Sequence, residues 1–447
     1  MTARNALFAL IPALIASPGL AQSSSAVSEF TLNNGMQVLV RPDHRAPVVV
    51  SQVWYRVGSS YEGRGQTGLS HLFEHMMFKG TEAYPEGRFS EIISREGGRE
   101  NAFTGRDFSA YFEVMAADRL PIALELEADR MANLQINDDA LATERQVVLE
   151  ERRLRTDDRP EGRFSERFAA IAHPATGYAH PIIGWADDIR RFDVADLEQW
   201  YQQWYTPANA TLVVAGDVDP QAVHALAKEW FGDIPSREVP AVYDAENLDP
   251  PGERRLTYRD EQTQVAQLRM GYSVPSLATA ESSADPYALL MLASVLDGGE
   301  GARLAEDLVR GSEVAAAAGA GYNPMTRLDS EFSLFAVPSD GDIGAVEAAL
   351  RAQIKRLQDE LVSEEALERA RSQLLADHLF ELDSVFYQAM QIGMLETTGA
   401  GWETLEAFED NVRALSAEDL QAAARRYLQP EQLSVGVMLP DHSEDGA

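Results

Sequence analysis

An internal echo between the two halves of the sequence constrains the fold of this chain more than any other feature. Asp196-Leu197 recurs as Asp419-Leu420, and Pro207 recurs at the same offset as Pro430, with each proline standing before a β-like run. Residues 233–255 are rich in Pro, Asp and Glu, which is typical of a linker. A chain of 447 residues is also long for one core. The sequence therefore predicts two similar domains.

The charge balance is strongly acidic. Lys and Arg total 38 against 71 for Asp and Glu, which gives a net charge of -33. Binding to nucleic acid needs clustered Lys and Arg, so we expect no nucleic acid partner. High negative charge favours solubility, and an acidic enclosure would also attract basic peptides; composition leaves both readings open.

The first residues have the pattern of an export signal. Arg4 precedes an apolar run over residues 6–16, and small residues at 19–21 offer a cleavage site before Gln22. The run is too short to span a bilayer, so no membrane span is expected. The chain has no cysteine, which excludes disulfides and a lipid-anchored cysteine. These features predict a signal peptide at 1–21 and a soluble protein exported to a bacterial periplasm.

The first half begins with a hairpin pattern. Residues 30–32 and 36–41 flank the turn Asn33-Asn34-Gly35, where Asn-Gly supplies the positive φ of a tight turn. Residues 48–57 form a second β-rich run. Residues 101–114 are typical of extended chain because their aromatic residues suit a sheet.

Residues 66–78 predict a helix with one buried and one polar face. The apolar positions at i, i+3, i+4, i+7 and i+8 are Leu69, Leu72, Phe73, Met76 and Met77. His71, Glu74 and His75 therefore share the other face. Two imidazoles one helical turn apart suit one metal ion, and the carboxylate between them suits proton transfer from water.

The alternative is a surface helix that carries these polar residues by chance. The chain has only eight histidines, and two of them fall in this one turn. Without cysteine, any metal site is restricted to His, Asp and Glu. We therefore expect a metal-dependent hydrolase.

A helix over residues 139–155 offers the third ligand. Glu144 and Glu151 share its apolar face with Val147, Val148 and Leu154, whereas Glu150 groups with polar neighbours. A carboxylate on an apolar face is costly unless it is paired or binds metal, so Glu151 is the favoured ligand. The alternative is that Glu151 pairs with an arginine such as Arg152 or Arg155.

Other histidines and the second half do not repeat this pattern. His173 and His180 each precede a proline in a Gly-containing loop and are interpreted as turn residues. The offset between the repeated segments carries His71 to Ser294, Glu74 to Asp297 and His75 to Gly298. We expect the second domain to keep the scaffold, with a helix over 287–296, and to lack the ligands.

With these residues in place, the sequence resembles the pitrilysin/insulinase family of zinc peptidases, in the branch of mitochondrial processing peptidase and its bacterial relatives. That family has the inverted motif His-x-x-Glu-His and a glutamate about 76 residues later, the separation between His75 and Glu151 here. Residues 97–104, 144–151, 205–209 and 214–217 are similar as well, and the likeness runs from about Phe30 to Leu439.

The resemblance implies an α+β fold of two similar domains that face each other across a chamber, each a mostly antiparallel sheet packed with helices. The expected division is a zinc-binding domain at 22–235, a linker at 236–254 and a domain without metal at 255–447. It further implies that the strand with Asn101, Ala102 and Phe103 pairs with substrate backbone as an added β-strand.

The second domain departs from the family pattern. Active single-chain relatives carry an Arg and a Tyr seven residues apart that bind the substrate, after a turn matched here by residues 298–304. The corresponding positions here are Val309 and Ala316; Arg310 is one place away, and Tyr322 is too far along. Some family members divide these duties between two subunits. We expect this chain to be the zinc subunit of such a heterodimer.

The expected chemistry is peptide hydrolysis with one Zn²⁺ ion. His71, His75 and Glu151 hold the ion, Glu74 is the general base, and Glu144 orients a ligand. Two alternatives remain: a non-catalytic peptide-binding or scaffold subunit, and a purely structural zinc site, although structural sites seldom keep a base beside an open position. The metal itself could be another divalent ion.

Overall fold

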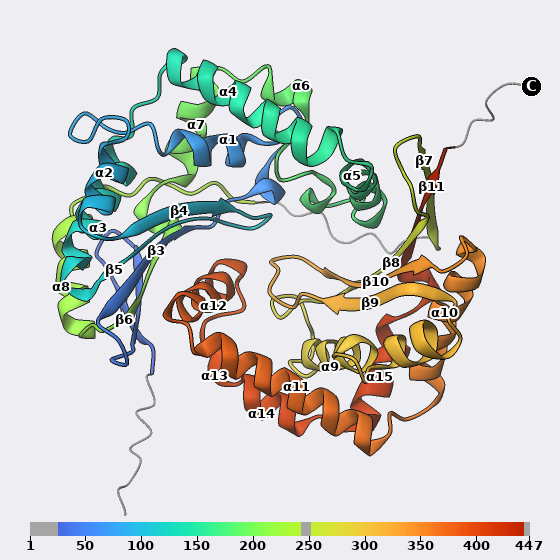
Figure 1. Cartoon of the computed structure of the whole chain (residues 1–447). Coiled ribbons are helices and arrows are strands. Elements are labelled where there is room, and N and C mark those ends of the chain that lie inside the picture. Colours follow the sequence, from blue (N-terminus) through green and yellow to red (C-terminus); the bar gives the residue numbers. More distant parts are fainter. Residues whose placement is uncertain (1–25, 243–251, 442–447) are drawn as a thin grey trace, which may run out of the picture.

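Two mixed sheets organise the protein (Figure 1). The computed structural model describes residues 26–242 and 252–441. The expected signal peptide at 1–21 and residues 243–251 of the expected linker lie outside this range. Arg254, the last residue of that linker, already belongs to a strand. The boundaries at 22–235 and 255–447 stay predictions.

The first sheet has six strands in the order β1-β2-β6-β3-β5-β4. These strands are β1 Ser28–Thr31, β2 Gln37–Pro42, β3 Val48–Tyr55, β4 Arg99–Thr104, β5 Ser109–Ala116 and β6 Ala210–Gly216. The helices of this half are α1 Leu69–Met76, α2 Arg88–Arg95, α3 Leu120–Asn133, α4 Asp138–Arg152, α5 Pro160–Ala172, α6 Ala186–Ile189, α7 Val194–Trp204 and α8 Pro220–Phe231.

The second sheet has five strands in the order β7-β11-β8-β10-β9. These strands are β7 Arg254–Asp260, β8 Gln267–Val274, β9 Ala315–Tyr322, β10 Ser330–Pro338 and β11 Leu433–Pro440. The helices are α9 Asp285–Asp297, α10 Ile343–Asp359, α11 Glu364–Leu382, α12 Val385–Thr398, α13 Glu403–Glu406, α14 Phe408–Ala414 and α15 Ala417–Tyr427. Short 3₁₀ or π turns link several elements, including π turns at Arg153–Asp157 and Ala305–Gly311.

The two sheets share one topology, which confirms the expected α+β fold of two similar units. The order β2-β6-β3-β5-β4 in the first half matches β7-β11-β8-β10-β9 in the second. In each sheet the first pair of that series is parallel and the remaining pairs are antiparallel. The helices α7 and α15 both begin with a capping box, at Asp193 and Ser416, two positions related by the same offset as the repeated segments of the sequence.

Local sequence explains the first strands. The hairpin β1–β2 turns at Gly35, whose φ of 86° is the left-handed conformation that glycine adopts without strain. The extended run expected over 101–114 is two antiparallel strands, β4 and β5, joined by a tight turn in which Gly105 donates to the Phe108 carbonyl. Because β4 is the last strand in the sheet order, it lies at an edge of the first sheet.

Each half lends one helix to the sheet of the other half. Helix α12, which follows α11 in the second half, packs on β3 and β6 of the first sheet (Figure 1). Helix α5, which follows α4 in the first half, packs on β7 and β11 of the second sheet. The exchange ties the two halves together.

Glycine makes both exchanged contacts close. A Cβ atom on Gly393 of α12 would lie 2.1 Å from the indole of Trp54 in β3. A Cβ atom on Gly436 of β11 would lie 2.6 Å from the ring of Phe168 in α5. Both contacts leave no room for a side chain.

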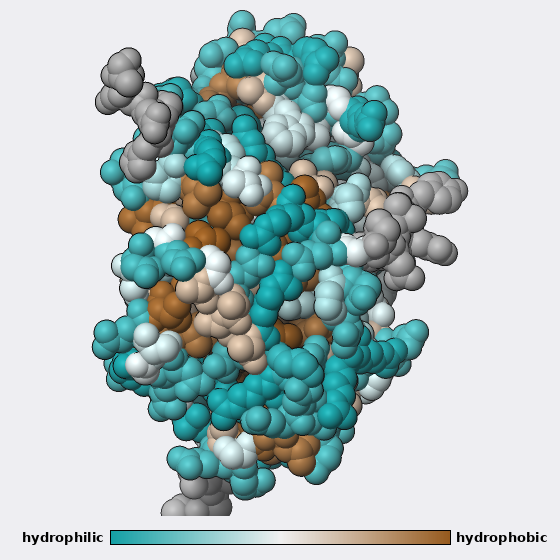
Figure 2. Space-filling model, turned by 90° about the vertical axis from the view of Figure 1, so that its right-hand side faces the viewer, coloured by the Kyte–Doolittle hydropathy of each residue, from teal (hydrophilic) through white to brown (hydrophobic). Residues whose placement is uncertain are grey.

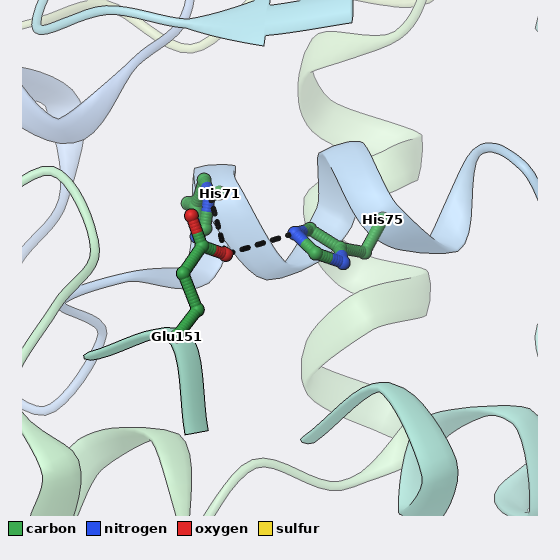
Figure 3. A group of neighbouring side chains, drawn as sticks. All are labelled: His71, His75 and Glu151. Carbon is green, nitrogen blue, oxygen red and sulfur yellow. Dashed lines mark ion pairs between the residues drawn. The ribbon is translucent and has the colours of Figure 1, made fainter. Parts of the chain in front are cut away.

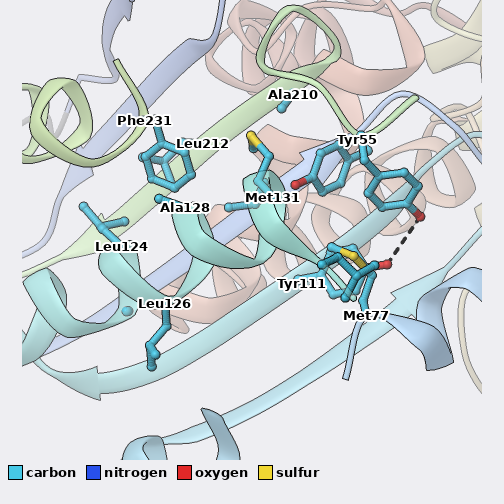
Figure 4. Close-up of a cluster of buried hydrophobic side chains, with 14 of the residues drawn as sticks. Tyr55, Met77, Tyr111, Leu124, Leu126, Ala128, Met131, Ala210, Leu212 and Phe231 are labelled. Carbon is cyan, nitrogen blue, oxygen red and sulfur yellow. Dashed lines mark hydrogen bonds between the residues drawn. The ribbon is translucent and has the colours of Figure 1, made fainter. Parts of the chain in front are cut away.

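Each sheet also has its own apolar core on the side of its own helices. Figure 4 shows part of the first, where Leu124, Ala128 and Met131 of α3 pack near Tyr55 and Leu212 of the sheet. The face of the molecule seen in Figure 2 is mostly hydrophilic, with hydrophobic residues gathered near its middle. Among the described helices, none is long and apolar enough to cross a membrane.

Candidate metal centre and peptide cleft

The helix expected over 66–78 is α1, and buried polar contacts fix its beginning. Gly68 precedes it with a φ of 87°. The carboxylate of Glu62 accepts hydrogen bonds from the main-chain N–H groups of Gly68 and Ser70, both at 2.8 Å. These amides lack partners within the helix, so the carboxyl oxygens of Glu62 satisfy them, while burial raises the pKa of Glu62 to about 8. The face with His71 and His75 is therefore held in one orientation.

Helix α4 supplies the two acids, with a face that differs in part from the sequence expectation. Leu141, Glu144 and Val148 are buried, as one face requires. Val147 and Leu154, which the sequence assigned to that face, are exposed by 45% and 51%. The helix contacts α1 along one face and opens into a π turn at Arg153–Asp157, so its last residues turn outward. Residues 139–155 are helical as expected, although the last turn is π rather than α.

The three predicted ligands converge (Figure 3). Glu151 Oε2 lies 3.7 Å from Nε2 of His71 and 3.6 Å from Nε2 of His75. Among the described residues, these three form the one group of His, Asp or Glu whose donor atoms meet the spacing of a metal site, all within 4.8 Å of one another. Donors bound to one tetrahedral zinc lie about 3.4 Å apart, because each bond is about 2.0–2.2 Å long. The cluster fits zinc.

The second oxygen of Glu151 has another partner. Arg155, one turn further along the chain, places its Nη1 atom 2.6 Å from Oε1. Glu151 therefore has an arginine partner and the geometry of a metal ligand at the same time, because one carboxylate oxygen faces Arg155 and the other faces the histidines. Arg152 instead binds Glu166 and the Gly184 carbonyl. Glu150 is 56% exposed and pairs with Arg153, as its polar face predicts.

Glu144 lies behind His75. Its Oε2 atom is 3.0 Å from Nδ1 of His75, and its Oε1 atom is 2.5 Å from Nζ of Lys79. A carboxylate on Nδ1 fixes the histidine tautomer so that Nε2 carries the lone pair toward a metal. Lys79 holds this carboxylate in turn.

His71 is suited to metal binding by its charge state. Burial, followed by the nearby His75 and Arg155, lowers the pKa of His71 to about 3. The imidazole is therefore neutral at pH 7, which is the form that binds a metal. Its Nδ1 atom is buried and has no hydrogen-bond partner among the described residues.

Glu74 points to the same cleft without joining the ligand cluster. Its Oε2 atom accepts a hydrogen bond of 2.5 Å from the Thr104 hydroxyl at the end of β4. Burial raises the pKa of Glu74, and the Thr104 bond and His75 oppose this rise. A carboxyl with a raised pKa is closer to the range that suits a general base near neutral pH.

The cluster opens into a cleft with a volume of about 760 Å³. The edge strand β4 forms one wall with Asn101, Ala102 and Phe103, and Ile182 and Ile183 form part of the remainder. The main-chain N–H of Ala102 donates to the side chain of Asn101 at 2.9 Å. An edge strand offers main-chain groups to an added strand.

Comparison with known proteins places this chain in a family. The family model described as insulinase (peptidase family M16) matches residues 37–184, and the model described as the peptidase M16 inactive domain matches residues 191–374. The zinc protease PqqE of Helicobacter pylori is 31% identical over 361 residues, which cover 79% of this chain and 80% of that protein. The chain belongs to the pitrilysin/insulinase family of zinc peptidases.

Two solved structures agree with this family. A protease from Helicobacter pylori superposes with a TM-score of 0.87 at 28% identity, covering 93% of this chain and all of that one. The first half of the periplasmic protease PqqL from Escherichia coli gives a TM-score of 0.79 at 20% identity, covering 92% of each chain. The second likeness concerns the fold alone.

The second half lacks a metal group of this kind within the described residues. Val309 lies in the π turn after α9, and Ala316 is exposed near the start of β9. The neighbouring Arg310 donates to the Glu300 carbonyl. His173 and His180 lie outside the metal cluster, as the sequence suggested.

Sequence reasoning gave no role to Lys79 and Thr104, which shape this site, and it named Arg155 only as an alternative partner of Glu151. Lys79 follows His75 by four residues and Arg155 follows Glu151 by four, so helical spacing was a usable signal for both. Thr104 ends a stretch similar to the family, but only the fold brings it to Glu74.

Proposed function

We propose that this chain is a zinc-dependent endopeptidase. One observation carries the proposal: donor atoms of His71, His75 and Glu151 converge beside the carboxylate of Glu74 at a cleft walled by an edge strand. A structural metal site would be closed by a fourth protein ligand, whereas this group leaves one side toward the cleft. The family to which the chain belongs supports the same chemistry.

His71, His75 and Glu151 would hold the ion, with Glu144 keeping His75 in the required tautomer. When bound, zinc supplies Lewis acidity that lowers the pKa of water towards about 7 and polarises the scissile carbonyl. The donor set contains no sulfur and suits zinc among other divalent ions.

Glu74 takes the proton from the attacking water and passes it to the leaving amine. Its position in the cleft beside the ligands supports this role, because a general base must lie within hydrogen-bond reach of the water. Thr104 holds one oxygen of this carboxylate at 2.5 Å, which leaves the other oxygen to face the water. We therefore assign catalysis to Glu74 and positioning to Thr104.

The substrate is a peptide or an unfolded segment, bound as an added strand along β4. Asn101, Ala102 and Phe103 would pair with its backbone, which selects extended chains with little regard to side chains. The Asn101 side chain now occupies the Ala102 amide and would give way to a substrate carbonyl. An enclosed chamber between the halves would limit entry to such extended chains.

The chain acts after export to the periplasm and with a second family subunit. The apolar run over residues 6–16 and the small residues that follow support export. Val309 and Ala316 stand where single-chain relatives carry the Arg and Tyr pair, so a partner would supply that pair. A sister chain without the inverted motif is the expected partner. Full peptidase activity of this chain alone would contradict the heterodimer.

Zinc content and cleavage of a quenched peptide test the function. The chain is purified alone and together with the sister chain from a neighbouring reading frame. We expect one zinc per chain, cleavage by the assembled enzyme, loss of cleavage with a chelator and recovery with added zinc. Zinc binding without cleavage in both preparations would favour a non-catalytic peptide-binding subunit and overturn the proposal.

A further inference from the structure

Beyond the end of β4 lies a group of arginines that outnumber the acidic side chains paired with them. Arg106 belongs to the turn after β4, and Arg254 and Arg269 belong to β7 and β8. Of these three, Arg269 alone forms an ion pair within the described residues, at 2.9 Å to Glu331. The chain as a whole carries a net charge of -33, so positive charge left unpaired here stands against the general balance.

The surroundings make the lack of counter-charge costly. Arg106 lies over the ring of Tyr178, 5.1 Å from its centre, and Arg269 lies over Phe168 at 4.5 Å. Burial lowers the pKa of both Arg106 and Arg254. A partly buried guanidinium without an acidic partner loses hydration that nothing replaces.

The nearby groups supply only part of the missing charge, because burial lowers the pKa of Arg106 more than Glu331 and Asp107 raise it. Burial lowers the pKa of His173 to about 3, and the three arginines add to this effect, so the imidazole is neutral. Asp107, next to Arg106 in the chain, is buried and bonds Ser60 and the Tyr178 hydroxyl. Its Oδ1 atom also lies 3.6 Å from Arg327. Glu331 is thus the acid that remains to pair with the three arginines, and it already forms an ion pair with Arg269.

The position of Arg106 relates the group to the cleft. Thr104, whose hydroxyl contacts Glu74, is two residues before Arg106. A strand rises about 3.3 Å per residue, so a peptide paired with β4 that continues past Thr104 comes level with Arg106 within about two to four residues of the scissile bond.

We propose that Arg106, with Arg269 beside it, binds a carboxylate of the peptide substrate a few residues from the scissile bond. The carboxylate is either the C-terminus of the peptide or an acidic side chain. Guanidinium and carboxylate match in geometry and form strong charge-assisted hydrogen bonds. This inference rests on the proposed peptidase function and names a preference of the same site.

Matched peptides test it in the assembled enzyme. One quenched peptide sequence is made with a free or an amidated C-terminus, and a second series carries Glu or Gln at each of four positions on either side of the scissile bond. We expect at least one carboxylate to raise kcat/KM about tenfold over its neutral partner. The arm that shows the effect identifies the source of the carboxylate.

Three variants assign the preference. The ratio of kcat/KM between the carboxylate peptide and its neutral partner measures the preference. Arg106→Gln should bring this ratio to within about twofold of one, and Arg106→Lys should keep part of the preference because the charge remains. Arg167→Gln removes an exposed arginine of α5 that also lies over an aromatic ring, Tyr258, and should leave the ratio unchanged. The melting temperature separates a structural role, because loss of an unpaired cation should not lower it.

The outcomes are distinct. No cleavage of any peptide by the zinc-loaded enzyme would remove the proposed function itself. Cleavage without any preference for a carboxylate, or a preference that survives in Arg106→Gln, would overturn the inference alone. A drop in the melting temperature of Arg106→Gln with an unchanged ratio would also overturn it, by assigning Arg106 to the fold.

Discussion

In the first half of the molecule, Glu74 on α1 meets the hydroxyl of Thr104 at the end of edge strand β4. In the second half, Asp297 at the end of α9 accepts the main-chain N–H of Ala320 in edge strand β9, at 3.1 Å. The offset between the two halves of the sequence relates Glu74 to Asp297, and both acids reach the edge strand of their own sheet.

This difference shows that the shared topology does not determine whether a half carries a metal cluster, and that single residues do. In the second half the Asp297 carboxylate accepts a backbone amide of edge strand β9, and Gly319 in that strand leaves room for it. A Cβ atom on Gly319 would lie 2.8 Å from the Asp297 carboxylate. In the first half the acid contacts a side-chain hydroxyl, and two imidazoles and Glu151 stand beside it. The same topology therefore supports one half with a metal cluster and one without.

The largest expected effect separates two neighbouring acids of α4. Glu151→Gln removes a proposed ligand, so we expect zinc content to fall from one ion per chain to near none. Turnover should fall by more than the 10–100-fold typical of residues outside the ligand set. Glu150→Gln is the control, because Glu150 is exposed and pairs with Arg153. Metal analysis and peptide cleavage measure both variants, and a zinc-loaded Glu151→Gln protein would refute the ligand role.

A smaller effect is expected behind His75. Glu144→Gln removes the carboxylate on Nδ1, so zinc affinity should fall by about 10–100-fold. Competition with a chelator of known affinity measures the change. Glu86→Gln serves as the control, because Glu86 is the other partner of Lys79 and is 64% exposed. Equal affinities of the two variants would place Glu144 outside the metal centre.

The exchanged helices predict a loss of stability that differs between the halves. Gly393→Ala forces a methyl group against Trp54, and Gly436→Ala forces one against Phe168 at a slightly longer distance. Overpacking costs about 1–3 kcal/mol, so each should lower the melting temperature by a few degrees, with Gly393→Ala the larger. Gly321→Ala, whose Cβ would meet only the Ser333 hydroxyl at 3.5 Å, is the control. Three equal melting temperatures would argue against the exchange.

The smallest expected effect is a loss of stability in acid. Arg45, assisted by Gln388 at the start of α12, lowers the pKa of Asp43 from 3.8 to about 2. The folded pKa lies below the unfolded one, so ionised Asp43 stabilises the fold above about pH 4, and this contribution is lost as the pH falls towards 2.

Melting temperatures at pH 5 and pH 3 check this prediction. The melting temperature of the wild-type protein should fall more from pH 5 to pH 3 than that of Asp43→Asn. Asp118 is exposed, so Asp118→Asn should behave as wild type. In the other half, Tyr258 and Arg163 lower the pKa of Asp260 in the same way, so Asp260→Asn should resemble Asp43→Asn. A similar pH response of wild type and Asp43→Asn would show that the contact of Asp43 with Arg45 and Gln388 does not stabilise the fold.

The sequence predicted two similar halves and the helix faces that carry His71, His75 and Glu151, because both depend on short-range patterns. The stripe through Leu69 and Met76 placed His71 and His75 on one face, and the cost of an acid on an apolar face singled out Glu151 over Glu150. The echo between the two halves is present in the capping boxes of α7 and α15. These features are set by helical periodicity and local hydrogen bonds.

The remainder depends on how distant segments pack. The exchange of α5 and α12 joins each helix to a sheet far away in sequence, and no local pattern reports such a partner. Val147 and Leu154 were misplaced because the face of α4 is set by its contact with α1 and by the π turn that follows. The contacts of Thr104 with Glu74 and of Asp297 with β9 likewise arise only in the folded chain.

The most direct measurement compares the two related acids, Glu74 and Asp297, in the assembled enzyme. Zinc content and turnover are determined for Glu74→Gln and Asp297→Asn in parallel. We predict that Glu74→Gln keeps one zinc per chain and loses turnover by about 10²–10⁴-fold, as removal of a general base requires. Asp297→Asn should keep both its zinc and its turnover. An active Glu74→Gln enzyme would contradict the assignment of Glu74 as the base, and with it the proposed mechanism.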